Sequence, residues 1–282
     1  TMFTPEAATL EAETLAPPRA VPASRLTTRW RRQRPTVFSV GGLLALWWLT
    51  TTLGWIDPLF LPSPQAVAAR LYRLAIDGFM DASLAQHLGA SLSRVLLALL
   101  AALLTAIPTG MLIGLNRTAR AALDPLIEFY RPIPPLAYLP LMVIWFGIGE
   151  TSKVLLIYLA IFAPLVIATA SGVRHLDPSR LQAAQSLGAS RAQQLRFVIL
   201  PGALPDILTG TRIALGAGWS TLVAAELIAA TRGLGFMVQS AAQFLVTDVV
   251  IAGILLIALI ALALELGLRY LQHRLTPWRE HV

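Results

Sequence analysis

The sequence predicts an all-α membrane protein with six transmembrane helices, and three observations lead to that prediction. First, 56% of the 282 residues are hydrophobic and only 13% are charged, about half of the roughly 25% that is usual in soluble domains. Second, the chain contains six long stretches without Asp, Glu, Lys or Arg. Third, arginines concentrate in alternate connections between these stretches, as in proteins that keep their basic loops on one side of a membrane.

The predicted spans follow from the charge-free stretches and from the length that a membrane requires. A helix crosses the hydrocarbon core with about 20 mostly apolar residues, and 35–56, 95–116 and 154–173 have that length. The shorter stretch 213–225 becomes long enough within 207–228, which carries a charge near each end. We therefore expect spans at about 36–56, 93–116, 130–149, 153–173, 204–228 and 248–268.

The arginines predict the side that each connection faces. Connections on the side of the N-terminus hold most of them, among them Arg29, Arg117, Arg174 and Arg191. The opposite connections hold the basic residues Arg70, Arg73, Arg94, Lys153 and Arg232. The positive-inside rule then places both termini in the cytoplasm. The first apolar stretch starts too late and is too long for a cleaved signal peptide, so we expect it to remain as a span.

The segments before and after the first span differ in character. Residues 1–28 are rich in Ala, Pro, Thr and Glu and lack an apolar stripe, which predicts a disordered cytoplasmic tail ahead of one transmembrane domain, 29–282. After the span, Ser63 can cap a helix whose first residue is Pro64. We expect this helix to lie on the outer membrane surface or to act only as a packing element.

The longest cytoplasmic connection, 174–203, predicts two short helices joined at a sharp bend. Asp177 followed by Pro178 is typical of a helix start, and Gly188 can adopt the left-handed conformation that ends a helix. Ser190 with Gln193 predicts a second capped start, and Pro201 predicts another break. Small residues at Ala183 and Ala184 would permit close approach by another protein; an ordinary cytoplasmic loop is the alternative.

This connection resembles the EAA loop of permease subunits of bacterial ATP-binding-cassette (ABC) importers. That loop reads Glu-Ala-Ala, three residues, Gly, nine residues, then Ile-x-Leu-Pro, and the chain has Gln182-Ala183-Ala184, Gly188 and Val198-Ile199-Leu200-Pro201. Gln182 replaces the family Glu, which weakens an expected salt bridge but not the docking geometry. Val198 replaces the family Ile. The resemblance implies that these residues contact the ATPase subunit: Gln182, Ala183, Ala184, Ser186, Leu187, Gly188, Ala189, Leu200 and Pro201.

Further sequence segments extend the resemblance over roughly 43–279, to the nitrate, sulfonate and taurine branch of these permeases. They are Pro58–Pro62, Leu139–Gly149 and Thr221–Glu226. Within the branch, Tyr130–Tyr138 and Leu227–Phe236 are most similar to taurine permeases. The resemblance implies the type I importer fold, with six helices and a two-helix cytoplasmic coupling loop in a single permease domain. It also implies a multi-pass location in the bacterial inner membrane.

The resemblance implies an ATP-driven complex, and the chain contains no nucleotide-binding loop of its own. A phosphate loop needs Gly-Lys followed by Ser or Thr, whereas the only lysine, Lys153, follows Ser152. ATP and Mg²⁺ are therefore expected on two partner ATPase subunits, with no cofactor in this chain. The other implied partners are a second copy of the chain, a periplasmic substrate-binding protein and the lipid bilayer.

The composition argues against an enzyme and against nucleic-acid binding. The chain has no cysteine, and its histidines at 87, 175, 273 and 281 have no spacing that would join two on one helix face, so no metal site is predicted. The net charge of +7 is divided into short clusters between apolar runs rather than gathered on one basic face. We expect neither a catalytic residue nor a nucleic-acid partner.

For the translocation pathway, the sequence offers one charged residue inside a span. Glu226 lies in the outer part of the fifth span, preceded by Trp219, Ser220 and Thr221, and an acidic group in a span normally faces a cavity or a partner. We expect these four residues to line the pathway; pairing of Glu226 with a basic group such as Arg232 is the alternative. Small residues in spans two and five predict close packing within the subunit or a seam between subunits: Ala106, Gly110, Gly114, Gly210, Ala214, Gly218, Thr221 and Ala225.

The sequence thus predicts the membrane subunit of an importer that translocates taurine or a related small sulfonate by alternating access, after delivery by the binding protein. One alternative keeps the importer and changes the cargo to alkanesulfonate, nitrate or another small anion. Another is an ion-coupled secondary transporter or channel, against which stand the two-helix loop and the absence of inverted repeats.

Overall fold

The computed structural model describes residues 25–278, which divide into two compact units, Thr1–Trp55 and Ile56–Val282. In the described residues every regular element is a helix, apart from an isolated bridge between Phe79 and Ala82. The helices are α2 (Arg25–Thr52), α3 (Pro64–Asp77), α4 (Leu84–Leu115), α5 (Arg117–Tyr130), η1 (Pro135–Tyr138), α6 (Leu139–Phe146), α7 (Glu150–Arg174), α8 (Pro178–Ser186), α9 (Arg191–Gln194), η2 (Leu195–Ile199), α10 (Leu200–Ala229), α11 (Leu234–Gln243) and α12 (Thr247–Leu275).

The first unit consists of the single helix α2. Residues 1–24 of the expected tail lie outside the described residues, and 25–28 are helical. At its other end, Thr51 and Thr52 donate hydroxyl hydrogen bonds back to carbonyls one turn earlier. These bonds satisfy polar groups at the end of an apolar helix, where water is the only other partner.

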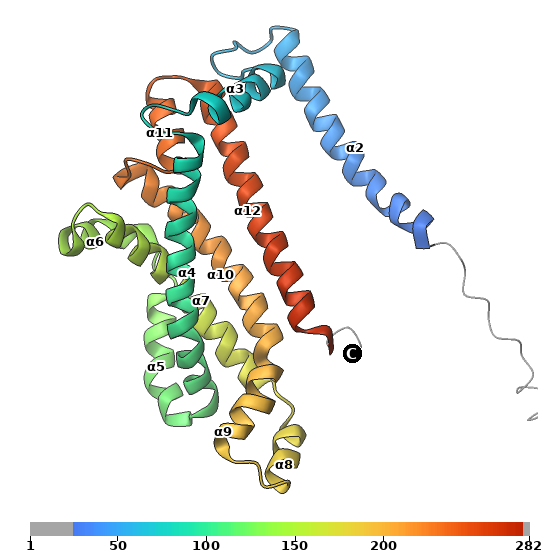
Figure 1. Ribbon diagram of the computed structural model, residues 1–282, viewed down its shortest axis with the longest axis vertical. Coiled ribbons are helices and arrows are strands. Elements are labelled where there is room, and N and C mark those ends of the chain that lie inside the picture. The colour runs from blue at the N-terminus through green and yellow to red at the C-terminus, as the bar shows by residue number, and fades with distance from the viewer. Residues whose placement is uncertain (1–24, 279–282) are drawn as a thin grey trace, which may run out of the picture. The chain divides into compact units, whose positions relative to one another are not determined.

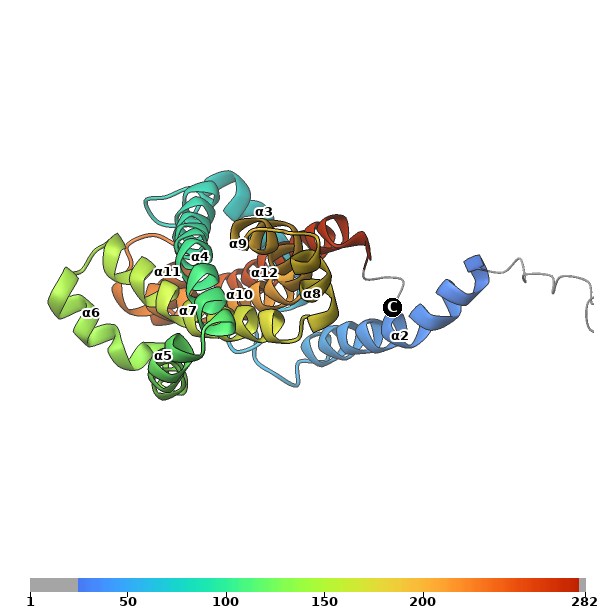
Figure 2. The same cartoon turned by 90° about the horizontal axis from the view of Figure 1, so that it is seen from below.

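The second unit is built around α7, which packs against α4 on one side and α10 on the other (Figures 1 and 2). Half of the most apolar window of α7 is buried inside the chain. Small residues on the neighbours allow this approach: a Cβ added to Gly110 of α4 would lie 2.7 Å from the Val166 carbonyl oxygen, and one at Gly218 of α10 would lie 2.6 Å from Ile161. The predicted small-residue stripes therefore contact a helix of the same subunit.

Four of the described helices are long and apolar enough to cross a membrane: Leu84–Leu115, Glu150–Arg174, Arg191–Ile228 and Thr247–Leu275. They agree with four of the predicted spans. The α12 helix differs from the others because only 17% of its most apolar window is buried. Most of its apolar surface therefore remains available to lipid or to another chain.

The region of the third predicted span, 130–149, is broken rather than one long helix. It contains the short 3₁₀ helix η1 and the eight-residue α6, which project sideways from the bundle (Figure 1). Pro134, Pro135 and Pro140 explain the break, because proline lacks the amide donor and clashes with the preceding turn. Apolar side chains along this segment are strongly exposed, among them Ile144, Trp145 and Ile148.

At the end of the bundle where α4 begins, α3 packs on α12. Ser63 caps α3 by accepting from the amide of Ala66, as the sequence predicted, and Val67 and Leu74 are buried. Arg70 of α3 forms an ion pair of 2.7 Å with Asp248 of α12. The α3 helix is thus a packing element of the bundle, and its opposite face remains exposed.

Candidate functional site

The coupling-loop candidate forms the opposite end of the bundle, where α8 and α9 project together (Figure 1). Asp177 accepts a hydrogen bond of 2.9 Å from the amide of Ser179 and caps α8, whose first residue is Pro178. This amide holds the pKa of the Asp177 carboxyl below its ordinary value. Gly188 follows α8 with φ of +77°, a conformation that costs a residue with a Cβ about 1–2 kcal/mol. Both ends of α8 agree with the sequence prediction.

The second half of the loop differs from the prediction. Ser190 and Gln193 form the expected capping box, but the chain does not break at Pro201. Instead α9, the π-helical η2 and α10 run on as one helix, Arg191–Ile228. Pro201 lies in the first turn of α10, directly after the π turn η2. The wider hydrogen-bond spacing of a π turn interrupts the regular helical ladder at this point, so the helix continues past the proline.

The loop presents its residues to solvent. Neither α8 nor α9 has a buried residue, and the Leu187 side chain at the bend is 88% exposed. Phe197 is also exposed, with the Arg196 guanidinium 5.5 Å from its ring centroid. A cavity of about 380 Å³ lies beside it, lined by Arg180, Phe197, Val198, Pro201, Gly202 and Trp278. Apolar side chains exposed at a projecting tip are typical of a docking surface.

The structure separates the four residues predicted to line the pathway. Trp219 is 7% exposed and lines a second cavity, described below. Ser220 is exposed and donates to the Gly216 carbonyl, whereas Thr221 is buried and donates to Ala217. Glu226 lies five residues beyond Thr221 on α10, about 1.4 turns further, in a different environment.

Glu226 belongs to a buried ion cluster that joins three helices. Its carboxylate is 1% exposed and accepts from Arg94 Nη1 at 2.6 Å, from Ser91 Oγ at 2.7 Å and from the amide of Gly235 at 2.9 Å. The pairing alternative therefore fits the geometry, but the partner is Arg94 of α4 and not the Arg232 side chain. Arg232 contributes its carbonyl, which accepts from Arg94 at 2.7 Å.

Arg94 also holds the start of α7. Its Nη2 donates at 2.7 Å to Glu150, which also accepts from Lys153 at 2.9 Å. Arg94 and Lys153 are each 3% exposed. Glu150 and Lys153 are thus part of the ion cluster rather than an isolated surface pair. The two buried positive charges are balanced by Glu226, which is also buried, and by Glu150, whose side chain is 62% exposed.

Glycines and a histidine close the cluster on the side of α11. Gly233 has φ of +137°, and a Cβ added there would lie 2.4 Å from the Glu226 carboxyl carbon. Nδ1 of His87 lies 3.2 Å from the amide nitrogen and 3.1 Å from the carbonyl oxygen of Gly233, and Nε2 lies 3.2 Å from the Phe79 carbonyl oxygen. The connection between α10 and α11 is therefore fixed to α4 by hydrogen bonds.

Sequence reasoning missed the part played by Arg94. It counted Arg94 only as a basic residue of an outer connection. A signal was present, since Arg94 directly precedes a charge-free stretch and Glu226 ends another. Two opposite charges at the same predicted depth of neighbouring spans favour a pair.

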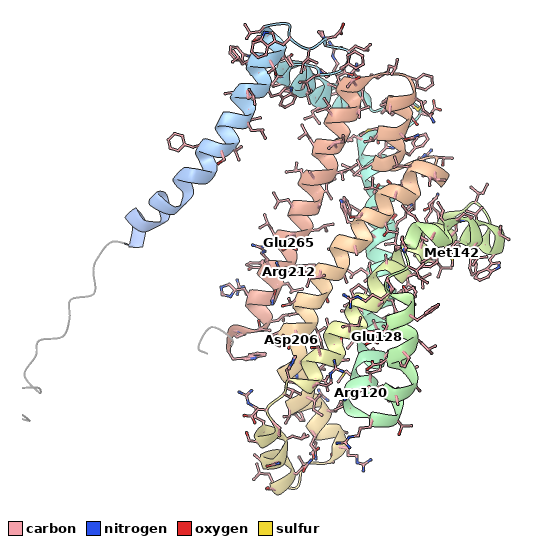
Figure 3. The ribbon with its side chains drawn as sticks, turned by 180° about the vertical axis from the view of Figure 1, so that it is seen from behind. Arg120, Glu128, Met142, Asp206, Arg212 and Glu265 are labelled. Atoms are coloured by element: carbon pink, nitrogen blue, oxygen red, sulfur yellow. The ribbon has the colours of Figure 1, made fainter. Side chains whose placement is uncertain are left out.

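A second polar set lies between α10 and α12. Arg212 and Glu265 contact one another across the two helices, as Figure 3 shows. Gln272 accepts from Arg212 at 3.2 Å and donates to Thr209 at 3.0 Å. In the part of the chain that the structure describes, no group of three His, Cys, Asp or Glu side chains could hold a metal ion.

Comparisons with known proteins agree with this architecture. The family model described as binding-protein-dependent transport system inner membrane component matches residues 106–277. The taurine transport system permease protein TauC of Escherichia coli (strain K12) is 65% identical over 262 residues, which cover 92% of this chain and 95% of TauC. The putative aliphatic sulfonates transport permease protein SsuC of the same organism is 36% identical over 250 residues, covering 89% and 94%.

A solved structure supports the fold at lower similarity. The MetNI methionine ABC transporter in an inward-facing conformation aligns with a TM-score of 0.62 and 16% identity, covering 68% of this chain and 96% of that chain. The helical bundle, its four long apolar helices and the match over more than half of the sequence lead to one conclusion. The chain belongs to the family of binding-protein-dependent transport system inner membrane components, the permease subunits of ABC importers.

Proposed function

We propose that the chain is the membrane subunit of an importer for taurine or a related small sulfonate, which moves its cargo by alternating access. The observation that carries this proposal is the 65% identity to TauC over 92% of the chain. The putative aliphatic-sulfonate permease is 36% identical over a similar length, so alkanesulfonate is the weaker assignment. The cargo would arrive from a periplasmic binding protein.

Six crossings of the inner membrane are part of the proposal, although only four of the described helices are both long and apolar enough to cross a membrane. Glu150 contacts Arg94, which lies ten residues after the start of α4. The chain between the end of α4, at Leu115, and Glu150 therefore returns along most of the bundle. We assign this return to α5, η1 and α6 together, as a bent third crossing. The 28-residue α2 supplies the first crossing, with both termini in the cytoplasm.

The projecting loop is proposed as the contact with two ATPase subunits, which would bind ATP and Mg²⁺ for the complex. Its support is the exposure of α8, Leu187 and Phe197 and the fixed bend at Gly188. The contact residues are those of the EAA-like motif: Gln182, Ala183, Ala184, Ser186, Leu187, Gly188, Ala189, Leu200 and Pro201. ATP binding would draw two such loops together and turn the pathway outward.

A second copy of the chain is proposed to complete the pathway. The exposed apolar surfaces of α6 and α12 are where we place the contact with this copy. Lipid would cover what the partner copy does not. Within the pathway we retain Trp219, Ser220 and Thr221 as candidates, and we place Glu226 in the ion cluster that holds the outer ends of the helices together.

Uptake in cells tests the function. The chain is expressed with its ATPase and binding protein in cells that lack their own taurine importer, and labelled taurine is supplied with an excess of unlabelled alkanesulfonate, nitrate or taurine. We expect uptake that only taurine suppresses strongly. Uptake that alkanesulfonate or nitrate suppresses equally well would transfer the assignment to that anion.

A further inference from the structure

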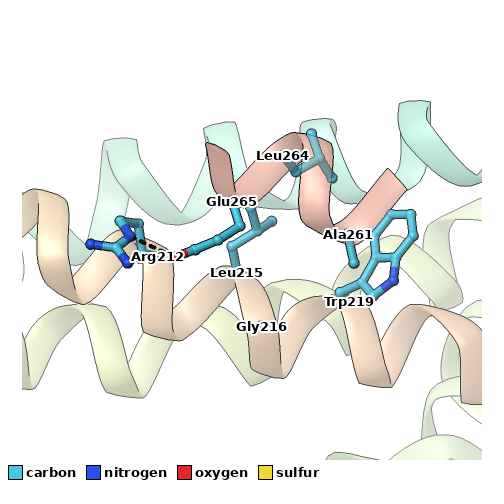
Figure 4. Close-up of a pocket in the computed structure, with 7 residues that line it drawn as sticks. All are labelled: Arg212, Leu215, Gly216, Trp219, Ala261, Leu264 and Glu265. Carbon is cyan, nitrogen blue, oxygen red and sulfur yellow. Dashed lines mark hydrogen bonds and ion pairs between the residues drawn. The ribbon is translucent and has the colours of Figure 1, made fainter. Parts of the chain in front are cut away.

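A cavity between α10 and α12 combines charges of both signs with an aromatic side chain. Its volume is about 230 Å³, and it is lined by Arg212, Gly216 and Trp219 of α10 and by Leu264 and Glu265 of α12, with other apolar groups. Figure 4 shows Arg212 paired with Glu265 toward one end and Trp219 at the other. Since one water molecule occupies roughly 30 Å³ of liquid, the cavity has room for a molecule of a few heavy atoms.

The charges around the cavity leave binding capacity for both ends of a zwitterion. Arg212 and Arg269 both donate to Oε1 of Glu265, from their Nε atoms at 3.1 and 3.0 Å. In the described part of the chain, Oε2 of Glu265 accepts no hydrogen bond that would block an ammonium group. Arg212 lines the cavity, whereas Arg269 is 61% exposed and lies outside the lining, so Arg212 is the guanidinium that a bound anion would meet.

Arg212 and Glu265 lie within two neighbouring expected spans, toward the cytoplasmic end of each. Arg212 lies eight residues into the expected span 204–228, and Glu265 lies three residues before the end of the expected span 248–268. Ionisable groups inside a span are costly and normally face a cavity or a pathway. Unlike the Arg94–Glu226 cluster, which is sealed by its own partners, Arg212 and Glu265 keep about a quarter to a third of their side-chain surface exposed.

We infer that the cavity between α10 and α12 is a binding site for a zwitterionic sulfonate. Arg212 holds the sulfonate, and Oε2 of Glu265 with the ring of Trp219 holds the ammonium. In taurine a two-carbon chain separates these groups, which fits a cavity lined by a guanidinium group, a carboxylate and an indole. The inference rests on the proposed function and adds to it a substrate site within the permease.

A binding experiment without the periplasmic protein tests the site. The full chain, co-expressed with its ATPase, is placed in lipid nanodiscs, and labelled taurine is displaced by taurine or by ethanesulfonate, which lacks the ammonium. In the wild type we expect taurine to bind about tenfold more tightly, from one partly exposed ion pair and one cation–π contact. In Glu265→Gln this preference should vanish while ethanesulfonate affinity stays the same or rises.

Two control variants separate recognition from folding. Arg274→Gln, on the same helix, removes a guanidinium that packs over the Tyr270 ring and does not line the cavity, so it should preserve the preference for taurine. Gly216→Val places a larger side chain in the cavity and should abolish binding of both ligands. The fold should tolerate the change, because an added Cβ meets nothing within 4 Å. Gly267→Val adds the same side chain in open space on α12 and should leave binding intact.

Three results would overturn the inference. The first is a Glu265→Gln variant that keeps the wild-type preference for taurine. The second is Gly216→Val with unchanged binding. The third is a phospholipid, detected by native mass spectrometry, that occupies the wild type and is lost in Gly216→Val. ATP-driven taurine uptake by the wild type is measured in parallel. If one of these three results is found and the wild type still takes up taurine, only the proposed site is wrong. If the wild type takes up no taurine, the proposed function is wrong too.

Discussion

Arg94 of α4 and Glu226 of α10 form an ion pair of 2.6 Å in which neither side chain is more than 4% exposed. The same guanidinium binds Glu150 at the start of α7 and the carbonyl of Arg232. One side chain thus holds the ends of three membrane helices and the connection to α11. Arg94 therefore determines how these ends are arranged.

Removing Arg94 should destabilise the chain strongly. Arg94→Met leaves Glu226 buried without a counter-charge, which costs about 3–5 kcal/mol in comparable buried pairs. Adding Glu226→Gln should restore part of this loss, because the neutral amide oxygen still accepts from Ser91 and from the Gly235 amide. Thermal unfolding of the purified protein in detergent measures both effects.

An exposed ion pair provides the control for this prediction. Arg269→Met removes a guanidinium whose side chain is 61% exposed, and such pairs contribute about 0–1 kcal/mol. If Arg94→Met and Arg269→Met lower the unfolding temperature equally, the buried Arg94–Glu226 pair does not stabilise the protein more than an exposed pair does.

Gly233→Ala should disrupt the connection between α10 and α11. The positive φ disfavours any residue with a Cβ, and the added carbon would collide with the Glu226 carboxylate. We expect a lower unfolding temperature and faster hydrogen exchange at the start of α11. Gly89→Ala is the matched control, because its Cβ meets nothing within 4 Å and alanine is favoured over glycine in a helix by up to about 1 kcal/mol.

Gly110→Val should force α4 away from α7. The new side chain would meet the Val166 carbonyl and Thr169 at less than 3 Å, and overpacking of this kind costs about 1–3 kcal/mol. Gly89→Val tests the same change at an open position of the same helix. Equal stability of the two variants would mean that the small-residue stripe serves a seam between subunits instead.

Gly188→Val tests the coupling loop. Its φ of +77° is strained for a β-branched residue, so the bend between α8 and α9 should open and association with the ATPase should fall. Co-purification of the ATPase with the tagged chain measures this, with Gly267→Val as the control for adding valine at an open glycine. An ATPase that is retained equally by both variants would count against the loop as its docking site.

The sequence predicted the long helices well because their signal is local. Charge-free stretches marked 95–116 and 154–173, and the caps at Asp177, Ser190 and Ser63 were visible in short patterns that the structure reproduces. Each of these features depends on residues within a few positions of one another. Helix type and cap position were therefore readable without tertiary information.

The predictions that the structure changed concern features that hydropathy and short patterns do not describe. The chain continues through Pro201 by way of the π turn η2, which no local pattern marked. The break in 130–149 does follow local prolines, but hydropathy alone indicated one span there. The partner of Glu226 lies 132 residues earlier in the chain. Hydropathy and spacing contain no information on such distant pairings, so Arg94 was counted as a loop charge.

The central claim is that this permease carries taurine with energy from a partner ATPase, and reconstituted transport tests it most directly. The chain, its ATPase and the binding protein are assembled in proteoliposomes, with ATP inside or absent and with or without an imposed ion gradient. The account predicts labelled taurine uptake that requires ATP and the binding protein and that resists competition by nitrate. Uptake that proceeds on the ion gradient without ATP, or transport of another anion with none of taurine, would contradict it.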